Sequence, residues 1–247
     1  MQDRLDVGEV LRQVFRIYVD QAPVLMPAAA VVFVFTGVLS TVLVSSAPGL
    51  LLVALVISFT ATTLFTGMVV QLVADVRDGR RDAGARQLLR AAVPVLGPLL
   101  AVGIVAGIGV VIGFVLLIVP GLILITVWSV AAPVVVLERP PGLRALARSR
   151  ELVRGNGWQV FGVIFVLFIL VGIVSGAIEL AAESAGTGVG IVVRVIVGVL
   201  TAPLSALGAS VLYFHLRGTR ERETTGSESA GDGASAAKAG AGPGGEA

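Results

Sequence analysis

The sequence predicts an all-α membrane protein with six transmembrane helices. Hydrophobic residues make up 56% of the 247 residues, charged residues only 14%, and the mean hydropathy is +0.97. A soluble domain carries about 25% charged residues. Three long stretches contain no ionisable residue: 21–74, 91–137 and 155–178. Because a spanning helix needs about 20 apolar residues, the first two stretches are each long enough for a pair of helices.

The first part of the chain predicts a short amphipathic helix followed by a hairpin of two spans. Asp6 is placed to cap a helix over residues 6–18, with Glu9 three residues later, and apolar residues recur along one face. We expect this helix to lie at the membrane interface. The first span then covers about 22–44, and an uncharged turn leads into the second span, about 50–74.

The remaining spans are separated by two basic connections. The stretch 91–137 is too long for one span, and Val119-Pro120-Gly121 is the best place for a turn because proline and glycine together favour one. The predicted third, fourth, fifth and sixth spans are about 93–118, 121–137, 158–182 and 189–216. The membrane domain therefore ends near residue 217. Residues 218–247 contain no large apolar residue, which predicts a disordered tail.

The positive charges predict how the chain is threaded. Lysine and arginine occur in the N-terminal segment, in the second-to-third and fourth-to-fifth connections, and in the C-terminal segment, while the three alternate turns have none. The positive-inside rule then places both termini in the cytoplasm. Arginine predominates over lysine in a chain rich in alanine, valine and glycine, which suggests a high-G+C bacterium. We therefore expect the protein in a bacterial cytoplasmic (inner) membrane.

A local pattern recurs in front of the first, third and fifth spans. It consists of Arg, then Gln or Glu, then two apolar residues, then Arg, at 12–16, 86–90 and 150–154. The repetition predicts three units, each made of a cytoplasmic interfacial amphipathic helix and a membrane hairpin. The alternative is that any short basic helix before a span looks this way, because arginines four residues apart share one helical face.

The longest polar interruption, 138–162, holds the first candidate site. Pro141 suits the first turn of a helix, and Gly155 suits its C-terminal end. We expect the helix between them to present a face for anionic lipid headgroups or a protein partner. The candidate residues are Arg144, Arg148, Arg150, Arg154 and Trp158. The alternative is that these arginines only set the membrane topology.

The second candidate site consists of charges near the external ends of the last two spans. Glu179 and Arg194 are expected at similar depths, where they can form an intramembrane ion pair, and Glu183 is a third charge closer to the turn. A charge at membrane depth is costly and often functional, for example on a transport pathway. The alternatives are a structural pair or helix ends that reach the headgroups.

The sequence offers no candidate for catalysis, a metal or a cofactor. There is no cysteine, and His215 is the only histidine, expected at the interface. No phosphate-binding loop, nucleophile elbow or zinc-protease motif is present. The basic residues are scattered among the connections rather than gathered in one stripe, so we expect no nucleic-acid partner.

Several segments resemble the membrane domain attached to some bacterial glycerophosphoryl diester phosphodiesterases, which also occurs as stand-alone membrane proteins. The resemblance is carried by Pro120-Gly121, by 128–138, by 145–149 and by 152–158, and also by 8–11, 15–18 and 212–217. In that family the last block often has Asp where this chain has His215. The hydrolase of those enzymes is a separate domain with its own metal ligands, and this chain has no such domain. The resemblance therefore implies a helical membrane module with an anchoring or lipid-associated role.

We therefore expect a non-enzymatic membrane module that binds lipids, anionic ones in particular, or organises a protein partner. The alternative is a small transporter or permease with Glu179, Glu183 and Arg194 along its path. An enzyme of lipid metabolism is a third and weaker alternative.

Overall fold

The fold is known from a computed structural model, which describes residues 6–79, 85–183 and 187–240. Over these ranges the chain forms helices and no strand. Six segments are long and apolar enough to cross a membrane: 22–43, 51–77, 86–116, 118–137, 157–178 and 195–222. The protein is therefore an all-α membrane protein, as predicted.

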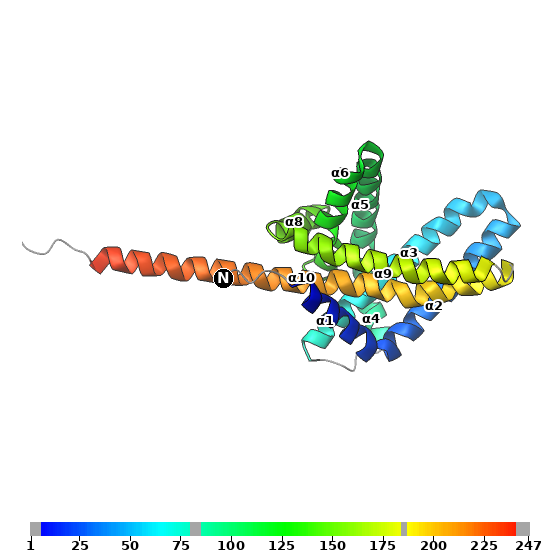
Figure 1. The fold of residues 1–247 in the computed structure, drawn as a ribbon, viewed down its shortest axis with the longest axis horizontal. Coiled ribbons are helices and arrows are strands. Elements are labelled where there is room, and N and C mark those ends of the chain that lie inside the picture. The colour runs from blue at the N-terminus through cyan, green and yellow to red at the C-terminus, as the bar shows by residue number, and fades with distance from the viewer. Residues whose placement is uncertain (1–5, 80–84, 184–186, 241–247) are drawn as a thin grey trace, which may run out of the picture.

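The helices follow one another as three units, each a short helix and then a hairpin (Figure 1). The first unit contains α1 (Val7–Asp20), α2 (Ala22–Ser46), the short 3₁₀ helix η1 (Pro48–Leu50) and α3 (Leu51–Arg77). The second contains α4 (Ala85–Ala92), η2 (Val93–Val95), α5 (Leu96–Leu116), α6 (Ile118–Trp128) and α7 (Ala131–Leu137). The third contains α8 (Arg144–Val153), α9 (Gly157–Glu183) and α10 (Thr187–Gly240).

Helix α1 begins where the sequence places its cap. The Asp6 carboxylate accepts a hydrogen bond of 2.8 Å from the backbone N–H of Gly8, which satisfies a donor that the first turn leaves unpaired. Val10, Val14 and Ile17 are buried on one face of the helix. The side chains of the arginines between them are exposed.

The division between the third and fourth spans differs from the prediction. The chain turns at Leu117, whose backbone is extended, and α6 already begins at Ile118. Pro120 and Gly121 therefore lie inside the first turn of α6 rather than in the turn itself. The physical reason is that proline fits the start of a helix, where its missing N–H costs nothing.

The fourth span is itself divided into α6 and α7. Pro133 has no N–H to donate to the carbonyl of Ser129, so the helix cannot run on through this point without losing a hydrogen bond. The Ser129 hydroxyl donates to the Thr126 carbonyl at 2.9 Å, which satisfies one of the acceptors that the interruption leaves.

The packed core lies at one end of the three hairpins. We call this end the base and the outer parts of the hairpins the arms. Within the described residues, the base core combines side chains of all three units, among them Val14, Phe65, Val73, Val134, Leu152, Leu207, Tyr213 and Leu216. In Figure 1 the arm formed by α5 and α6 points away from the other two, whereas α2 and α10 pack against each other. Many large apolar side chains of the arms are exposed, for example Val38, Val56, Ile112 and Phe168. The base therefore holds the hairpins together.

Helix α10 continues beyond the end of the predicted membrane domain. The sequence predicts disorder from residue 218, whereas α10 runs to Gly240. An ion pair supports its first turns past the base: Arg217 pairs with Glu221 at 2.8 Å, four residues on. The Thr219 hydroxyl donates to the His215 carbonyl of the same helix at 3.0 Å.

Candidate functional site

The candidate site is built around α8, the short helix of the third unit. After α7 the chain reverses direction through Arg139 and Gly142, both with positive φ (48° and 58°). The helix begins at Arg144, so Pro141 precedes the helix instead of occupying its first turn; its carbonyl accepts the N–H of Arg144 at 3.4 Å. The predicted C-terminal glycine is confirmed, because Gly155 has φ 96° directly after the capping residue Arg154.

One face of α8 is buried in the base. Ala145 and Leu152 are among its buried apolar side chains, and Ser149 is fully buried between them. The Ser149 hydroxyl donates a hydrogen bond of 2.7 Å to the Val127 carbonyl of α6. That carbonyl lies in the last turn of α6, where the helix can no longer supply an N–H. Ser149 thus fixes α8 to the point where the fourth span breaks.

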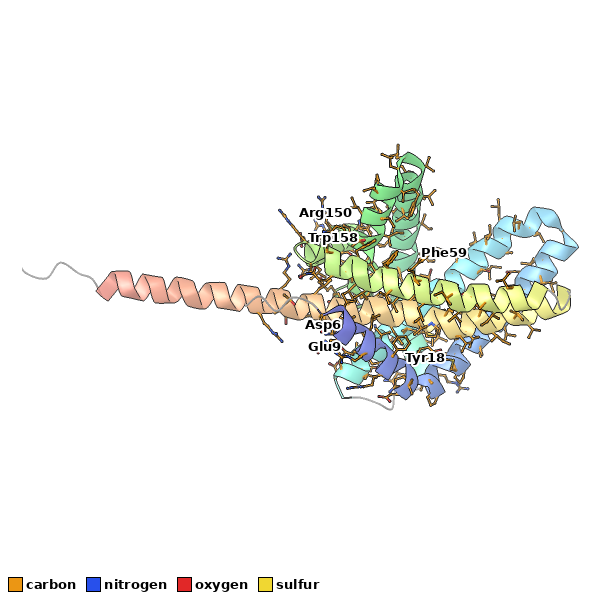
Figure 2. The ribbon with its side chains drawn as sticks, in the orientation of Figure 1. Asp6, Glu9, Tyr18, Phe59, Arg150 and Trp158 are labelled. Atoms are coloured by element: carbon orange, nitrogen blue, oxygen red, sulfur yellow. The ribbon has the colours of Figure 1, made fainter. Side chains whose placement is uncertain are left out.

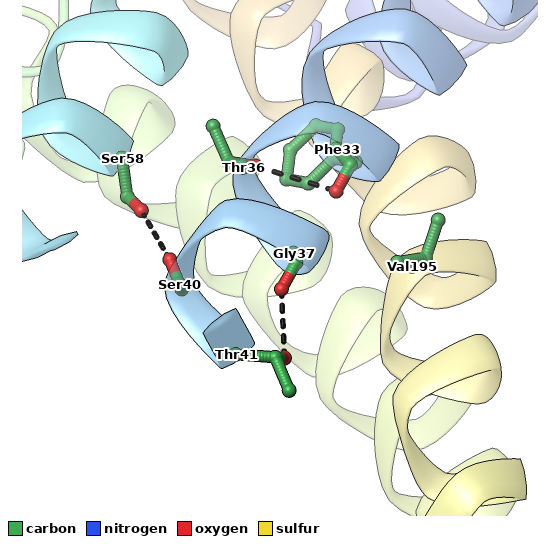
Figure 3. A pocket seen from close by; sticks show the side chains of 7 residues that line it. All are labelled: Phe33, Thr36, Gly37, Ser40, Thr41, Ser58 and Val195. Atoms are coloured by element: carbon green, nitrogen blue, oxygen red, sulfur yellow. Dashed lines mark hydrogen bonds between the residues drawn. The ribbon is translucent and has the colours of Figure 1, made fainter. Parts of the chain in front are cut away.

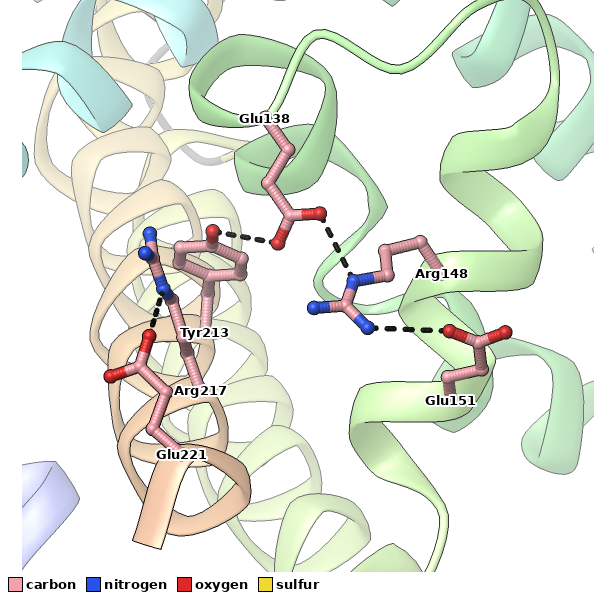
Figure 4. A network of polar contacts seen from close by, with 6 residues as sticks. All are labelled: Glu138, Arg148, Glu151, Tyr213, Arg217 and Glu221. Carbon is pink, nitrogen blue, oxygen red and sulfur yellow. Dashed lines mark hydrogen bonds and ion pairs between the residues drawn. The ribbon is translucent and has the colours of Figure 1, made fainter. Parts of the chain in front are cut away.

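A second contact joins α7, α8 and α10 through one carboxylate. Glu138, directly after α7, accepts hydrogen bonds on both oxygens: Tyr213 donates to Oε1 at 2.9 Å, and Arg148 donates to Oε2 at 3.0 Å (Figure 4). Arg148 also donates to Glu151 at 3.3 Å. We call Glu138, Arg148, Glu151 and Tyr213 the α8 network. It ties residues far apart in the chain into one polar cluster at the base.

The network gives Arg148 a different role from its neighbours. Burial lowers the pKa of Arg148, but the hydrogen bonds and negative charges of Glu138 and Glu151 outweigh burial and raise that pKa above its usual value. Arg148 therefore stays positive and turned toward Glu138. Of the predicted headgroup residues, it is the one already engaged by carboxylates.

The other predicted residues of this face are exposed. They are Arg144, Arg150, Arg154 and Trp158. Figure 2 labels Arg150 and Trp158 close together where α8 gives way to α9. The Trp158 ring is 84% exposed and meets the edge of Phe161, with 5.9 Å between ring centroids. Arginines beside an exposed indole are typical of a membrane interface.

Helix α10 supports the C-terminal end of α8. The Arg220 guanidinium donates to the backbone carbonyls of Glu151 at 2.8 Å and of Arg154 at 2.5 Å. These carbonyls belong to the last turn of α8, where a cation is favourable. Around this contact lies a polar hollow of about 420 Å³, lined by Arg148, Glu151, Leu152, Arg154, Arg220 and Glu221. The start of the predicted tail is therefore part of the site.

The same arrangement of arginines occurs on the short helices of the first two units. Exposed pairs four residues apart are Arg12 and Arg16 on α1, Arg86 and Arg90 on α4, and Arg150 and Arg154 at the end of α8. The first apolar residue between each pair is buried in the base: Val14, Leu88 and Leu152. The second is exposed in α1 and α4, but in α8 it is Val153, which is buried. The third helix thus sits deeper in the base than the other two.

An apolar groove begins beside α8. It has a volume of about 470 Å³ and lies between α6, the end of α8 and the start of α9. Its lining residues are Val119, Leu122, Ile123, Thr126, Val127, Val153, Gly157, Trp158 and Phe161. The one side-chain hydroxyl in this lining, that of Thr126, already donates to the Leu122 carbonyl at 2.8 Å. The groove therefore presents apolar surface.

A second groove, of about 280 Å³, lies among α2, α3 and α10 and carries hydroxyl groups (Figure 3). Thr36 and Thr41 donate to carbonyls of their own helix, both at 2.8 Å, and Ser40 and Ser58 are hydrogen bonded to each other at 3.1 Å. Because these hydroxyls have partners within the protein, the groove does not by itself indicate a polar substrate.

The predicted ion pair lies outside the part that is described at the level of side chains. The backbones of Glu179, Glu183 and Arg194 are helical, but their side chains are not among those the structure describes. The pair and the transport pathway based on it stay predictions. Among the described residues, no group of three or more His, Cys, Asp or Glu side chains is arranged to hold a metal ion. His215 lies near the end of the base, where its Nδ1 is 3.0 Å from the Val211 carbonyl.

Comparison with protein families gives one match. Residues 87–216 match the model of a domain of unknown function, DUF8558. The match covers more than half of the chain. The protein belongs to the DUF8558 family. The DUF8558 segment runs from α4 to the last buried turn of α10, and so includes the apolar groove and the whole α8 network. No curated protein and no solved structure matches the chain.

Sequence reasoning missed five members of this DUF8558 site: Glu138, Ser149, Glu151, Tyr213 and Arg220. Glu138 carries a signal that is visible in hindsight, since it is the first ionisable residue after Arg90 and directly follows a span. Tyr213 is one of two tyrosines in the chain and lies close to the end of the last span. Their pairing across 75 positions depends on how α7 and α10 pack, which no local pattern encodes.

Proposed function

We propose that this DUF8558 protein is a non-enzymatic module of the bacterial inner membrane that gathers anionic phospholipids around its base. In this proposal the base faces the cytoplasm, as do both termini, and α1, α4 and α8 lie along the membrane surface as amphipathic helices. The spans anchor the module, and the three short helices contact lipid headgroups of the inner leaflet.

The observation that carries the proposal is the threefold set of exposed arginine pairs: Arg12 with Arg16, Arg86 with Arg90, and Arg150 with Arg154. Each pair stands on a helix whose opposite face is buried in the base, so the arginines project from a fixed position. A guanidinium binds phosphate through two parallel N–H groups, which gives geometric as well as electrostatic selectivity.

The expected energy is sufficient to select among lipids. A basic residue close to an anionic membrane surface contributes about 1 kcal/mol. Several such contacts around one base bias its lipid neighbours toward anionic species, even when salt screens each contact. The turns at the other end of the hairpins carry no arginine, so we expect no preference for anionic lipid there.

The test is native mass spectrometry of the protein released from nanodiscs that contain equal amounts of phosphatidylglycerol and phosphatidylcholine. We expect retained lipid to be enriched in phosphatidylglycerol. Replacing all six paired arginines with glutamine should remove the enrichment, and replacing them with lysine should keep most of it because the charge remains. Equal enrichment in the glutamine variant would refute the proposal.

Orientation is tested separately, because removing arginines also weakens the topology signal. The chain has no cysteine, so single cysteines can be introduced without background. With a membrane-impermeant maleimide on intact cells, Ser45→Cys should react and Ser227→Cys should not. The opposite pattern would contradict a cytoplasmic base. The same labelling of the glutamine variant shows whether it keeps the wild-type orientation.

A further inference from the structure

We propose that the apolar groove between α6, α8 and α9 holds one acyl chain of an anionic phospholipid, with the phosphate of that lipid at Arg150 and Arg154. The inference rests on the proposed function and makes it specific: one defined lipid site on the third unit, beyond the general attraction at all three short helices.

The lining of the groove determines which part of a ligand it accepts. Its walls are aliphatic and aromatic side chains, and the Thr126 hydroxyl is already paired within α6. A buried polar group of a ligand would lose its hydrogen bonds there, at a cost of about 1–3 kcal/mol per group. From Val119 to Val127 the floor follows α6 for about 12 Å. A flexible hydrocarbon chain fits these requirements.

The mouth of the groove determines which lipid it accepts. Val153, Gly157 and Trp158 form the end of the groove that lies at the α8–α9 junction. Arg150 is one helical turn before Val153, and Arg154 directly follows it, and both side chains are exposed. A ligand with its chain in the groove therefore has Arg150 on the same helical face as Val153. Next to Val153 in the chain it has Arg154, which also lines the polar hollow beside Arg220. Charge complementarity requires a negative group there.

Selectivity has to come from this mouth. Lipid tails are as apolar as the groove, so inserting a chain gains little from the hydrophobic effect within a bilayer. The groove supplies position, and the arginines supply the preference. Arg148 does not take part, because its guanidinium is held by Glu138 at 3.0 Å and Glu151 at 3.3 Å. Those contacts fix α8, and with it the two exposed arginines, relative to the groove.

The structure provides a closely matched pair of positions for the test. Ile123 lines the groove and is 55% exposed, whereas Ile108, on the other helix of the same hairpin, is 56% exposed and does not line it. Tryptophan at either position enlarges a membrane-facing side chain, so neither change disturbs the base. Only Ile123→Trp fills the groove. Arg150→Gln removes one mouth charge, and Arg139→Gln, at an exposed arginine outside the three pairs, is its control.

The experiment is native mass spectrometry from nanodiscs of phosphatidylglycerol and phosphatidylcholine, with increasing activation to remove loosely held lipid. We expect one phosphatidylglycerol to survive on the wild type and on the two controls. Ile123→Trp and Arg150→Gln should each lower its occupancy about tenfold, which corresponds to a loss of about 1.4 kcal/mol. If the occupancy of phosphatidylglycerol is unchanged in both variants, the proposal is wrong. It is also wrong if phosphatidylcholine is retained in equal amount, or if a second copy of the chain is retained in place of lipid.

A second readout places the chain within the groove. The protein has two tryptophans, and Trp128→Phe leaves Trp158, which lines the groove, as the only tryptophan to be excited selectively. Phosphatidylglycerol with brominated acyl chains should quench Trp158 more strongly than brominated phosphatidylcholine at the same mole fraction. Equal quenching would count against the site. If the six-glutamine variant loses its general enrichment while Ile123→Trp and Arg150→Gln have no effect, the groove site fails and the proposed function stands.

Discussion

Replacing Tyr213 with phenylalanine should destabilise the protein through the α8 network. The Tyr213 side chain is fully buried, and its hydroxyl donates to the Glu138 carboxylate at 2.9 Å. A hydrogen bond to a charged group contributes about 1.5–3 kcal/mol. The Glu138 side chain is 23% exposed, so water can replace part of the lost bond, and we expect a loss of about 1.5–2 kcal/mol. For a chain of this size, the melting temperature should fall by about 3–8 °C.

The control uses the other tyrosine of the chain. The Tyr18 hydroxyl donates at 3.0 Å to a neutral acceptor, the Leu200 carbonyl, so Tyr18→Phe should cost about 0.5–1 kcal/mol. Both variants are compared by thermal unfolding in the same detergent, monitored by circular dichroism. If Tyr213→Phe lowers the melting temperature no more than Tyr18→Phe, the assignment of the network as a structural joint is wrong. Adding Arg148→Gln to Tyr213→Phe should be non-additive, because both partners bind one carboxylate.

Three further predictions concern single contacts. Gly109→Ala should destabilise the protein by about 1–3 kcal/mol, because a Cβ at this position would lie 2.5 Å from the Trp128 ring. Gly107→Ala is the control: a Cβ there would meet nothing within 4 Å, so the change should be neutral or slightly stabilising in the same melting assay. Ser149→Ala should lower the free energy of unfolding in urea by about 1–2 kcal/mol, because it leaves the Val127 carbonyl without its 2.7 Å hydrogen bond. A loss below about 0.5 kcal/mol would contradict this role of Ser149. A chain that ends after Arg217 lacks Arg220, which binds the last carbonyls of α8, so trypsin should cleave α8 faster. A chain that ends after Arg222 keeps Arg220, so cleavage within α8 should be unchanged.

The sequence predicts the number and order of the spans because their signal is local. A membrane helix must be apolar over its whole length, so the uncharged stretches reveal the spans directly. The same holds for the caps: Asp6 and Gly155 are recognised because the helix ends need a carboxylate acceptor and a positive φ. The turn after α5 was misplaced because proline fits the first turn of α6 as well as it fits a loop.

The sequence does not predict the α8 network or the groove, because both depend on packing between helices distant in the chain. The sequence of α8 suggests four equivalent arginines, but packing turns Arg148 toward Glu138 and leaves Arg150 and Arg154 exposed. Which arginine binds Glu138 depends on where α7 ends and on where Tyr213 packs. The tail was expected to be disordered for a similar reason. Arg220 contacts α8 through backbone carbonyls, which carry no sequence signal.

The position of the core explains why lipid contact should concentrate at the base. In the bilayer interior, apolar side chains gain little by leaving lipid for another helix, so nothing forces the arms to close on one another. In the proposed orientation α1, α4 and α8 lie at the membrane surface, where burial of their apolar faces removes apolar surface from water and does stabilise packing. The arm formed by α5 and α6 accordingly points away from the other two, and its exposed apolar surface is available to lipid chains. The groove between α6, α8 and α9 begins at the base and continues outward between two arms. In the proposed site the arginines beside it order the headgroup of a lipid, and its apolar surface accommodates the acyl chain.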